Sequence, residues 1–374
     1  MSPVTVLPQE MRAVVYRGIN DLRLETVPVP RIGSAELLVR VAVCGVCPTD
    51  IKKIHHGTVS APRIFGHETA GTIVKMGAGV RGFSVGDRVA LHHHVPCLDC
   101  HACRHGAFAQ CPVYKRTGIT AGFEPAGGGY AEYVRVMKFV LPGVVKIPRA
   151  NSFAEGALLE PVNTVLKAVK RLSLLRGDTV LVVGQGPIGL IFTRLLHLRG
   201  MRVLATDLLD RRLSLARQFG ALGVCRGDDP KLAERVARMT GKRGVDAAIV
   251  AVPSDEAVRA SQALVRGGGQ VLLFAHTRRG GSAGVDFSTI CVDEKDLLGS
   301  YSSDFTLQRE VARLVFSRQM DVRRLITHEF ALENTVQAVE QAAHPSGESL
   351  KILVRQHPEE TPGRSSGVRL AAQR

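Results

Sequence analysis

Four cysteines between residues 97 and 111 are the side chains whose spacing specifies a chemistry most directly. Cys97, Cys100 and Cys103 are separated from one another by two residues, and Cys111 follows after seven more. Four thiolates in so short a segment can close a tetrahedral shell around one zinc ion. A closed shell leaves no position for water or substrate, so the predicted role is to stabilise a loop, not to catalyse. The alternative, four cysteines that are unlinked or disulfide-bonded, is disfavoured because pairs this close in sequence suit a metal better.

A second set of possible metal ligands is scattered along the chain. It comprises Cys47, His67, Glu68 and Glu160. One thiolate, one imidazole and one carboxylate can hold zinc and leave a position open for an alcohol oxygen, as a catalytic zinc requires. Taken singly, Cys47 is more readily interpreted as a buried thiol and His67 as an ordinary loop histidine. Spacing alone therefore does not decide whether this second site exists.

Residues 184–189 form a glycine-rich loop, GQGPIG, between an apolar stretch and a helical pattern. Glycines at 184, 186 and 189 permit a tight turn and let a pyrophosphate approach the amides at a helix N-terminus. The next predicted strand, RVLAT, ends at Asp207, where a carboxylate can bind the ribose hydroxyls of NAD and repel the 2′-phosphate of NADP. NAD is therefore favoured over NADP. The alternatives are a glycine turn that binds nothing and, for Asp207, a helix N-cap.

The candidate residues lie in two regions of the chain that have different sequence patterns. Residues 11 to about 150 alternate short β-branched runs with Gly and Pro, which predicts an all-β region with ligands in its loops. From about residue 158, strand and helix patterns alternate, which predicts a parallel sheet covered by helices on both faces. Residues 311–320 and 334–343 have helical patterns, and 350–354 resembles a returning strand. The polar segment 358–374 is predicted to be a disordered tail.

Length, composition and charge limit the possible functions. A chain of 374 residues exceeds the usual size of one core, so we expect two domains. The first residues lack a signal-peptide pattern and no run reaches the ~18 apolar residues of a membrane span, so we expect a cytoplasmic protein without a membrane partner. Its cysteines are then metal ligands or free thiols. The net charge of +15 is spread along the chain and Trp is absent, which favours a solvated basic surface over nucleic-acid binding.

Several segments occur in the order found in the zinc-dependent medium-chain dehydrogenases. They are GVCPTD (45–50), GHETAGTIVKMGAGV (66–80), GDRV (86–89), the four-cysteine segment, GGGYAEY (127–133), Glu160-Pro161 and VVGQGPIGL (182–190). The chain resembles this family over residues 11 to 355. It is most similar to the sorbitol (polyol) and L-threonine dehydrogenase branch, because a glutamate stands at Glu160 where many alcohol dehydrogenases have a cysteine.

The resemblance implies a fold of α/β class in two domains. A GroES-like β-rich catalytic domain is expected from residues 1–157 and 300–357, with a structural zinc lobe at about 92–115. A Rossmann domain, a doubly wound parallel sheet that binds NAD, is expected from 158–299. The resemblance further implies two zinc ions per chain, a small-molecule alcohol substrate and a homotetramer or homodimer.

The resemblance also assigns roles to individual residues. Cys47 and His67 match catalytic zinc ligands, and Glu68 and Glu160 match carboxylates that ligate the metal directly or through water. Thr49 matches the hydroxyl that takes the substrate proton. Lys52 departs from the pattern, because many relatives have there a histidine that passes the proton to solvent. Lys52 is therefore one candidate for this outer relay, and His55 or His56 are the alternatives. The residues expected to contact the cofactor are Thr164, Gly184, Gly186, Pro187, Ile188, Gly189, Asp207 and Arg212.

The predicted activity is hydride transfer from a secondary alcohol, such as a polyol, sugar or amino alcohol, to NAD+. Zinc acts as a Lewis acid on the substrate hydroxyl, and the glycine loop holds the cofactor. A primary or secondary alcohol dehydrogenase of broader specificity is the nearest alternative. A zinc-independent reductase of the same fold would lack Cys47, His67 and the four cysteines. A zinc-ribbon nucleic-acid binder would not need the glycine loop.

Overall fold

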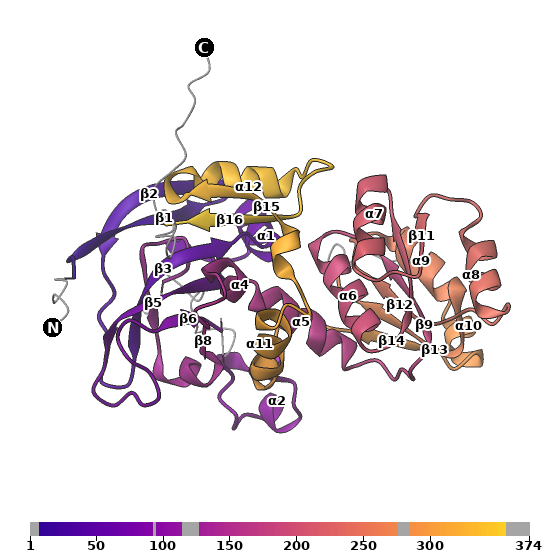
Figure 1. Cartoon of the computed structure of the whole chain (residues 1–374), viewed down its shortest axis with the longest axis horizontal. Coiled ribbons are helices and arrows are strands. Elements are labelled where there is room, and N and C mark those ends of the chain that lie inside the picture. The colour runs from indigo at the N-terminus through magenta and orange to yellow at the C-terminus, as the bar shows by residue number, and fades with distance from the viewer. Residues whose placement is uncertain (1–6, 93–94, 114–126, 276–283, 357–374) are drawn as a thin grey trace, which may run out of the picture.

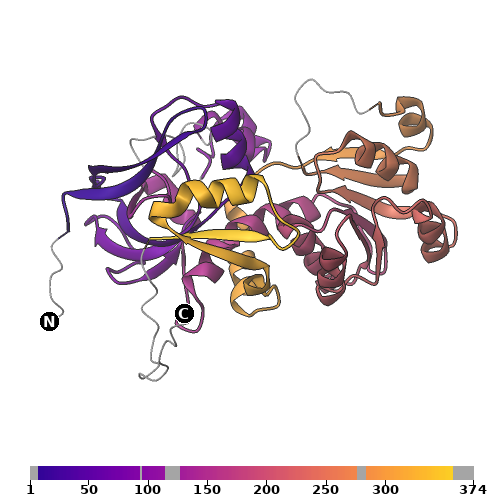
Figure 2. The ribbon, with the colours of Figure 1, turned by 90° about the horizontal axis from the view of Figure 1, so that it is seen from above.

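The structure, a computed structural model, describes residues 7–92, 95–113, 127–275 and 284–356. Figure 1 shows two bodies side by side, one rich in strands and one in which helices surround a sheet. The view from above in Figure 2 shows the same two bodies joined through the middle of the molecule. The predicted tail, 358–374, lies outside the described residues. Within those residues, the helices are too short or too polar for any of them to cross a membrane.

The first body, called here the β-rich body, contains two sheets. A seven-stranded sheet has the order β15-β16-β3-β5-β6-β8, with β7 also paired to β3, and a three-stranded sheet has the order β2-β1-β4. The strands are β1 (Glu10–Gly18), β2 (Asp21–Pro28), β3 (Leu37–Gly45), β4 (Arg63–Ile64), β5 (Glu68–Met76), β6 (Arg88–Ala90), β7 (Tyr133–Val136), β8 (Val145–Lys146), β15 (Ile326–Ala331) and β16 (Lys351–Arg355). The last two strands come from the end of the chain, and β16 pairs antiparallel with β3.

Short helices join the strands of the β-rich body and carry several predicted site residues. Helix α1 (Pro48–His56) follows β3, and α2 (His101–Arg104) lies within the four-cysteine segment. Helix α1 begins at Cys47, and Pro48 suits its first turn because a proline there loses no intrahelical hydrogen bond. It ends at Gly57, whose left-handed backbone (φ 60°) is readily adopted by glycine.

The second body, called here the Rossmann body, is built on a six-stranded parallel sheet of order β11-β10-β9-β12-β13-β14. Its strands are β9 (Thr179–Val183), β10 (Arg202–Asp207), β11 (Gly223–Arg226), β12 (Val245–Val250), β13 (Val265–Leu273) and β14 (Asp296–Gly299). Helices α6 (Pro187–Leu198), α7 (Asp210–Gln218), α8 (Leu232–Thr240), α9 (Asp255–Leu264) and α10 (Phe287–Val292) connect them. Every residue of β12 is buried, as expected for a strand covered on both faces. This order, with its reversal between β9 and β12, is that of a doubly wound sheet, so the predicted fold class is confirmed.

Helices near the junction of the two bodies share one apolar core. They are α4 (Phe153–Ala157), α5 (Leu159–Val169) and α11 (Gln308–Phe316), while α12 (Thr335–Ala343) covers the strands β15 and β16. The core runs from Val43 and Ala70 through Leu166 to Val180 and Val311. Asn163 on α5 donates to the carbonyl of Asp304 (2.9 Å) and accepts from its amide (2.8 Å). These bonds join the two segments through which the chain passes between the bodies.

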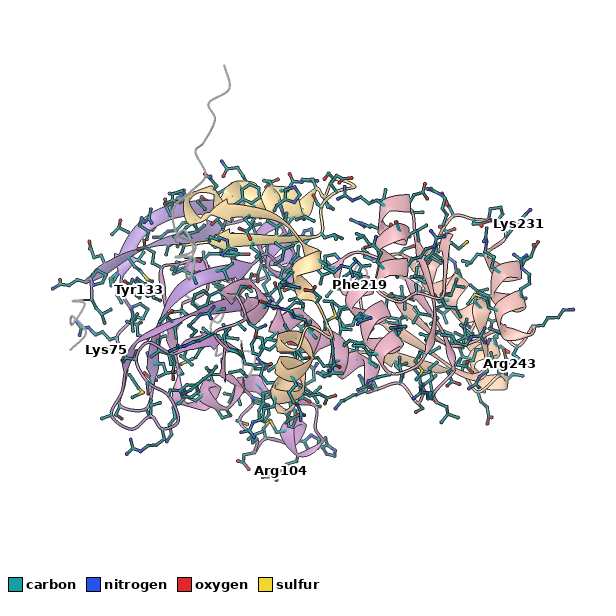
Figure 3. The ribbon with its side chains drawn as sticks, in the orientation of Figure 1. Lys75, Arg104, Tyr133, Phe219, Lys231 and Arg243 are labelled. Atoms are coloured by element: carbon teal, nitrogen blue, oxygen red, sulfur yellow. The ribbon has the colours of Figure 1, made fainter. Side chains whose placement is uncertain are left out.

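Exposed cations are spread over both bodies. Figure 3 shows Lys75 and Arg104 on the β-rich body, and Lys231 and Arg243 at the far end of the Rossmann body. All four are exposed. This distribution fits the predicted solvated basic surface.

Candidate active site

The four-cysteine cluster (Cys97, Cys100, Cys103 and Cys111) is assembled within the short segment that contains α2. The ligand atoms of all four lie within 4.8 Å of one another. The sulfur–sulfur distances are 3.5 Å for Cys100–Cys103, 3.6 Å for Cys97–Cys111 and 3.9 Å for Cys97–Cys103. All four are free thiols, so the disulfide alternative does not describe them.

The spacing of these sulfurs tests whether a zinc ion fits. With zinc–sulfur bonds of about 2.3 Å, a regular tetrahedron has its sulfurs about 3.8 Å apart. The observed range of 3.5–3.9 Å brackets that value. Backbone amides also face the sulfurs: the N–H of Cys100 donates to Cys97 Sγ and that of Cys97 donates to Cys111 Sγ, both at 3.4 Å. Such bonds favour thiolates, so the cluster suits a closed structural zinc site.

The cleft cluster (Cys47, His67 and Glu68) is brought together by strand pairing. Cys47 lies just after β3, His67 lies just before β5, and Glu68 is the first residue of β5. Because β3 and β5 are antiparallel, with Gly45 opposite Glu68, the end of one strand meets the start of the other. The ligand atoms of the three residues lie within 4.8 Å of one another. A Cβ at Gly45 would meet the Glu68 carboxylate at 2.0 Å, so any larger residue there would displace this carboxylate.

A buried aspartate holds the imidazole of the cleft cluster. His67 Nδ1 lies 3.1 and 3.2 Å from the two carboxylate oxygens of Asp50, which is fully buried. Burial by itself would lower the pKa of His67, but the charges of Asp50 and Cys47 raise it well above its usual value. The Asp50 contact occupies Nδ1, so Nε2 is the nitrogen left for a metal. Asp50 belongs to the segment GVCPTD but was not among the predicted site residues.

A buried lysine from the other end of the chain faces the carboxylate of the cleft cluster. Lys351, the first residue of β16, places Nζ 2.5 Å from Glu68 Oε1 and 3.0 Å from the carbonyl of Val46. Both side chains are buried. Burial would lower the pKa of Lys351, but the charges of Glu68 and Cys47 raise it. Lys351 was not among the predicted site residues, although a lysine that precedes the buried apolar run Ile352–Val354 is a signal that needs a partner.

Thr49 and Glu160 line the same cleft as Cys47, His67 and Glu68 but do not belong to the cleft cluster. Thr49 Oγ1 is 3.2 Å from Cys47 Sγ. Glu160, buried on α5, accepts at Oε1 from the hydroxyl of Thr164 at 3.2 Å. Burial raises the pKa of Glu160 to about 7. A carboxyl group with such a pKa can take either protonation state near neutral pH.

The three glycines of the loop differ in what surrounds them. Gly184 has φ of 90°, and Gly189 lies against the loop itself, where a Cβ would meet the Gly184 carbonyl oxygen at 1.7 Å. At Gly186, the N-cap of α6, a Cβ would meet nothing within 4 Å. Gly184 thus allows the tight turn, Gly189 allows close packing of the helix, and Gly186 leaves room for a pyrophosphate. A dinucleotide-binding loop requires these three features.

Asp207 ends β10 beside this loop. Its Oδ2 accepts from the amide of Gln185 at 2.6 Å and its Oδ1 from the amide of Leu209 at 3.0 Å. Leu209, not Asp207, is the N-cap of α7, so the helix-cap alternative does not apply. Each carboxylate oxygen retains an acceptor position for a ribose hydroxyl. Arg212 lies nearby, with Nη1 3.8 Å from Asp207 Oδ2.

One cleft of about 590 Å³ lies between the two bodies and is lined by residues of both. Its lining includes the cleft cluster and Thr49 on one side and the loop residues Gly186, Pro187 and Ile188 on the other. Lys52, Glu160, Thr164 and Arg212 also line it. A substrate and a dinucleotide can therefore meet in one space.

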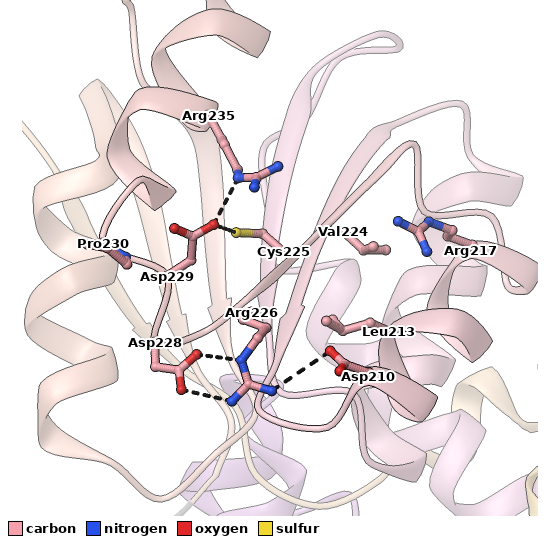
Figure 4. A pocket seen from close by; sticks show the side chains of 10 residues that line it. All are labelled: Asp210, Leu213, Arg217, Val224, Cys225, Arg226, Asp228, Asp229, Pro230 and Arg235. Carbon is pink, nitrogen blue, oxygen red and sulfur yellow. Dashed lines mark hydrogen bonds and ion pairs between the residues drawn. The ribbon is translucent and has the colours of Figure 1, made fainter.

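A second hollow lies at the edge of the Rossmann sheet, and Figure 4 shows its lining. Arg226 bridges Asp228 and Asp210, and Arg235 reaches Asp229, which also accepts from the thiol of Cys225. Three arginines and three aspartates line this hollow, so its charges balance. We interpret it as a structural ion-pair network.

The fold and the cleft together define the class of nicotinamide-dependent, zinc-binding dehydrogenases. Residues 33–149 match the family model of the alcohol dehydrogenase GroES-like domain, and residues 187–317 match that of zinc-binding dehydrogenases. Sorbitol dehydrogenase of Bacillus subtilis is 30% identical over 354 residues, covering 93% of this chain and 98% of that protein.

Solved structures agree with these sequence matches. A putative zinc-binding dehydrogenase from Sinorhizobium meliloti bound to NADP superposes with a TM-score of 0.84 and 28% identity, covering 93% of this chain and all of that one. For 2R,3R-butanediol dehydrogenase from Bacillus subtilis the TM-score is 0.82 and the identity 25%, with 93% of this chain and 100% of that one covered. The chain belongs to the zinc-dependent medium-chain dehydrogenase family, in its sorbitol dehydrogenase branch. It is therefore an oxidoreductase that acts on alcohols.

Proposed function

We propose that this protein oxidises a secondary alcohol, such as a polyol, a sugar or an amino alcohol, with NAD+ as hydride acceptor. The observation that carries the proposal is that the cleft cluster and the open side of the glycine loop line a single cleft. The matched proteins named as sorbitol and butanediol dehydrogenases support an alcohol with more than one hydroxyl.

The proposed mechanism assigns each step to residues of this chain. When bound, zinc supplies a Lewis acid that lowers the pKa of the substrate hydroxyl, and nicotinamide supplies the hydride acceptor. Cys47, His67 and Glu68 would hold the metal, with Glu160 as a further carboxylate at the same site. Asp50 fixes the orientation of the His67 ring, and Lys351 balances the charge of Glu68.

Thr49 would move the substrate proton. Its hydroxyl can accept a proton from the substrate and donate its own, and it lies 3.2 Å from Cys47 Sγ, next to the proposed metal position. Thr164 orients Glu160. Lys52 lines the cleft three residues beyond Thr49 on α1, so it is available for the outer relay.

The preference for NAD+ over NADP+ is part of the proposal and rests on Asp207. Its buried carboxylate closes the end of β10, where a 2′-phosphate would meet a like charge. Replacing Asp207 by Ser should narrow or invert the ratio of kcat/KM for the two cofactors. Better efficiency of the unchanged enzyme with NADP+ would contradict this assignment.

The assembly of the protein is proposed from the same observations. The two clusters would hold about two zinc ions per chain. We place the boundaries of the Rossmann domain at 158 and 299, since β9 to β14 lie within this range and β15 and β16 return to the β-rich sheet.

Edge strand β14 lies close in sequence to the exposed Phe287 and Val292, which favours pairing with a second copy in a homodimer or homotetramer. The eight cysteines form no disulfide, which fits the proposed location in the reducing cytoplasm.

The decisive experiment is a screen of secondary alcohols with NAD+ and NADP+ on zinc-loaded protein, with the metal content measured. Turnover of polyols with NAD+ and about two zinc ions per chain is expected. Thr49→Val should lower kcat by about 10²- to 10⁴-fold, whereas Thr49→Ser, which keeps the hydroxyl, should retain most of it. A fully active Thr49→Val enzyme would remove the proton relay from the mechanism.

A further inference from the structure

Three side chains that line the cleft carry a buried polar atom that has no hydrogen-bond partner within the part of the chain that the structure describes. They are Glu68 with Oε2, Arg212 with Nε and Ser300 with Oγ. Glu68 belongs to the cleft cluster, and Arg212 is expected at the adenosine ribose. The mechanism proposed above gives Ser300 no role. A buried hydroxyl without a partner costs free energy, which a hydrogen bond to a ligand would offset.

Ser300 is held at a defined place in the cleft. It follows β14, the last strand of the Rossmann sheet, and is only 8% exposed. Its amide donates to the carbonyl of Leu273 at 3.2 Å, next to the end of β13. The carbonyl of the following residue, Tyr301, accepts from Lys167 Nζ of α5 at 2.9 Å. The backbone is thus fixed on both sides, while the staggered χ1 positions of a serine let the hydroxyl turn toward a ligand.

The order of the Rossmann sheet indicates which part of a dinucleotide lies near Ser300. A doubly wound sheet has two halves, and each half binds one mononucleotide. Asp207 and Arg212 belong to the half formed by β9, β10 and β11, where the adenosine is expected. Strands β12, β13 and β14 lie on the other side of β9 (Figure 1). The nicotinamide nucleotide is therefore expected at the carboxyl ends of β12 to β14, which include Ser300.

The chemistry of this half of the lining suits a nicotinamide ring. The lining residues that follow β12 and β13 have apolar side chains, and they are Ala251, Pro253, Phe274 and Ala275. These surfaces suit the flat faces of the ring. Its one polar substituent is the carboxamide, which has a carbonyl acceptor and an NH2 donor. A serine hydroxyl both donates and accepts, so Ser300 can pair with either atom of the carboxamide.

We propose that the hydroxyl of Ser300 binds the carboxamide of the nicotinamide cofactor and so positions the ring for hydride transfer. The proposal rests on the cofactor of the function proposed above. A fixed carboxamide prevents the ring from rotating about its bond to the ribose, which keeps the carbon that receives the hydride directed at the substrate. The competing ligand is a second hydroxyl of a polyol. The substrate is expected at the cleft cluster on the β-rich body, whereas Ser300 ends a Rossmann strand, so the carboxamide fits better.

The test measures cofactor binding by calorimetry, without any alcohol. Ser300→Ala should raise the Kd for NAD+ by about three- to tenfold, as loss of one neutral hydrogen bond predicts. Two analogues locate the contact: 3-acetylpyridine adenine dinucleotide has a methyl in place of the NH2, and thionicotinamide adenine dinucleotide has sulfur in place of the oxygen. With at least one analogue the effect of Ser300→Ala should shrink, because that analogue already lacks the bond. NADP+ carries the same carboxamide and replaces NAD+ if it binds more tightly.

Ser261→Ala is the matched control. Ser261 on α9 is likewise a buried serine whose Oγ has no hydrogen-bond partner among the described residues, but it lies outside the lining of the cleft. Both variants should keep or raise the Tm of the protein without cofactor, because removing an unpartnered buried hydroxyl costs little. Only Ser300→Ala should reduce the rise in Tm that added NAD+ produces. A purely structural role of Ser300 predicts the same behaviour for both variants.

Each result bears on the proposal. A Ser300→Ala protein that binds NAD+ as tightly as the unchanged protein, or that loses the same factor with NAD+ and both analogues, would overturn it. A higher KM for sorbitol with an unchanged Kd for NAD+ would overturn it in favour of a substrate hydroxyl. If no alcohol is oxidised, the proposed function fails, and the binding comparison still decides the role of Ser300. Lack of binding of both NAD+ and NADP+ to the unchanged protein would overturn the proposal as well.

Discussion

The four-cysteine cluster and the cleft cluster differ in how far apart in the sequence their ligands and supporting residues lie. In the first, all ligands come from residues 97 to 111, and Cys97 is exposed. In the second, the ligands flank two paired strands, and their neighbours Asp50 and Lys351 come from a helix and from a strand 283 residues beyond Glu68. A structural zinc site with four protein ligands needs only a compact loop. A catalytic zinc site keeps one coordination position for substrate, so the rest of the fold must orient its protein ligands.

The two clusters also differ in what balances their charge. The sulfurs of the four-cysteine cluster have backbone amides and one another as neighbours. In the cleft cluster the partners are charged: Asp50 faces His67, and Lys351 faces Glu68. The first arrangement should therefore affect stability when it is disturbed, and the second should affect chemistry. The following predictions test this division.

The largest effect is expected for Cys47→Ser. Removing a ligand of the cleft cluster should lower kcat by at least about 10³-fold, as loss of a catalytic metal's contribution of several kcal/mol implies. The fold should survive, because Cys47 is only partly buried. Steady-state kinetics, elemental analysis and thermal unfolding test this. A variant with native activity would remove Cys47 from the site.

Cys100→Ser is the matched change in the other cluster. It should reduce zinc content by about one ion per chain and lower Tm and solubility, because a structural zinc site contributes directly to folding. Protein that remains folded and zinc-loaded in the cleft should still turn over substrate. If Cys100→Ser and Cys47→Ser had the same effects, the division into structural and catalytic clusters would be wrong.

Lys351→Met tests the charge balance of the cleft cluster. Without its lysine, the buried Glu68 carboxylate lacks compensation, which should destabilise the zinc-free protein by about 3 kcal/mol. Bound zinc would restore a positive charge, so the rise in Tm on adding zinc should be larger than in the unchanged protein. Lys351→Arg keeps the charge and serves as the control. An unchanged Tm in zinc-free Lys351→Met would show that the ion pair contributes nothing.

His92, which lies between the two clusters in sequence, should affect only the dependence of stability on pH. It is buried after β6, and burial lowers its pKa to about 4. A histidine in the unfolded chain titrates at about 6.5, so the unfolded state binds the proton first as pH falls. The contribution of neutral His92 is present above about pH 6.5 and is lost between there and about pH 4, by roughly 3 kcal/mol in all.

Denaturant unfolding of His92→Gln from pH 7 to pH 4 measures this contribution. The variant should lose stability less steeply with acid than the unchanged protein. His101→Gln, an exposed histidine of the four-cysteine segment, should keep the original slope. Equal slopes in all three proteins would show that acid acts through release of metal and not through His92.

What the sequence alone predicted depended on contacts between residues near one another in the chain. The four cysteines lie within fifteen residues, and the loop at 184–189 lies between a strand and a helix that are adjacent in sequence. The alternation of strands and helices after residue 158 predicted the parallel sheet for the same reason. The helical pattern at 311–320 was found at 308–316, because helix ends depend on packing as well as propensity.

The tertiary structure alone decided which distant side chains meet. Lys351 reaches Glu68 because β16 pairs with β3 and β3 pairs with β5, and neither register can be read from local spacing. The contact of Asp50 with His67 likewise depends on how α1 packs against the start of β5. Local spacing determines the shape of a turn or loop, whereas the charges around a reactive site are set by strand register and by packing between elements far apart in the chain.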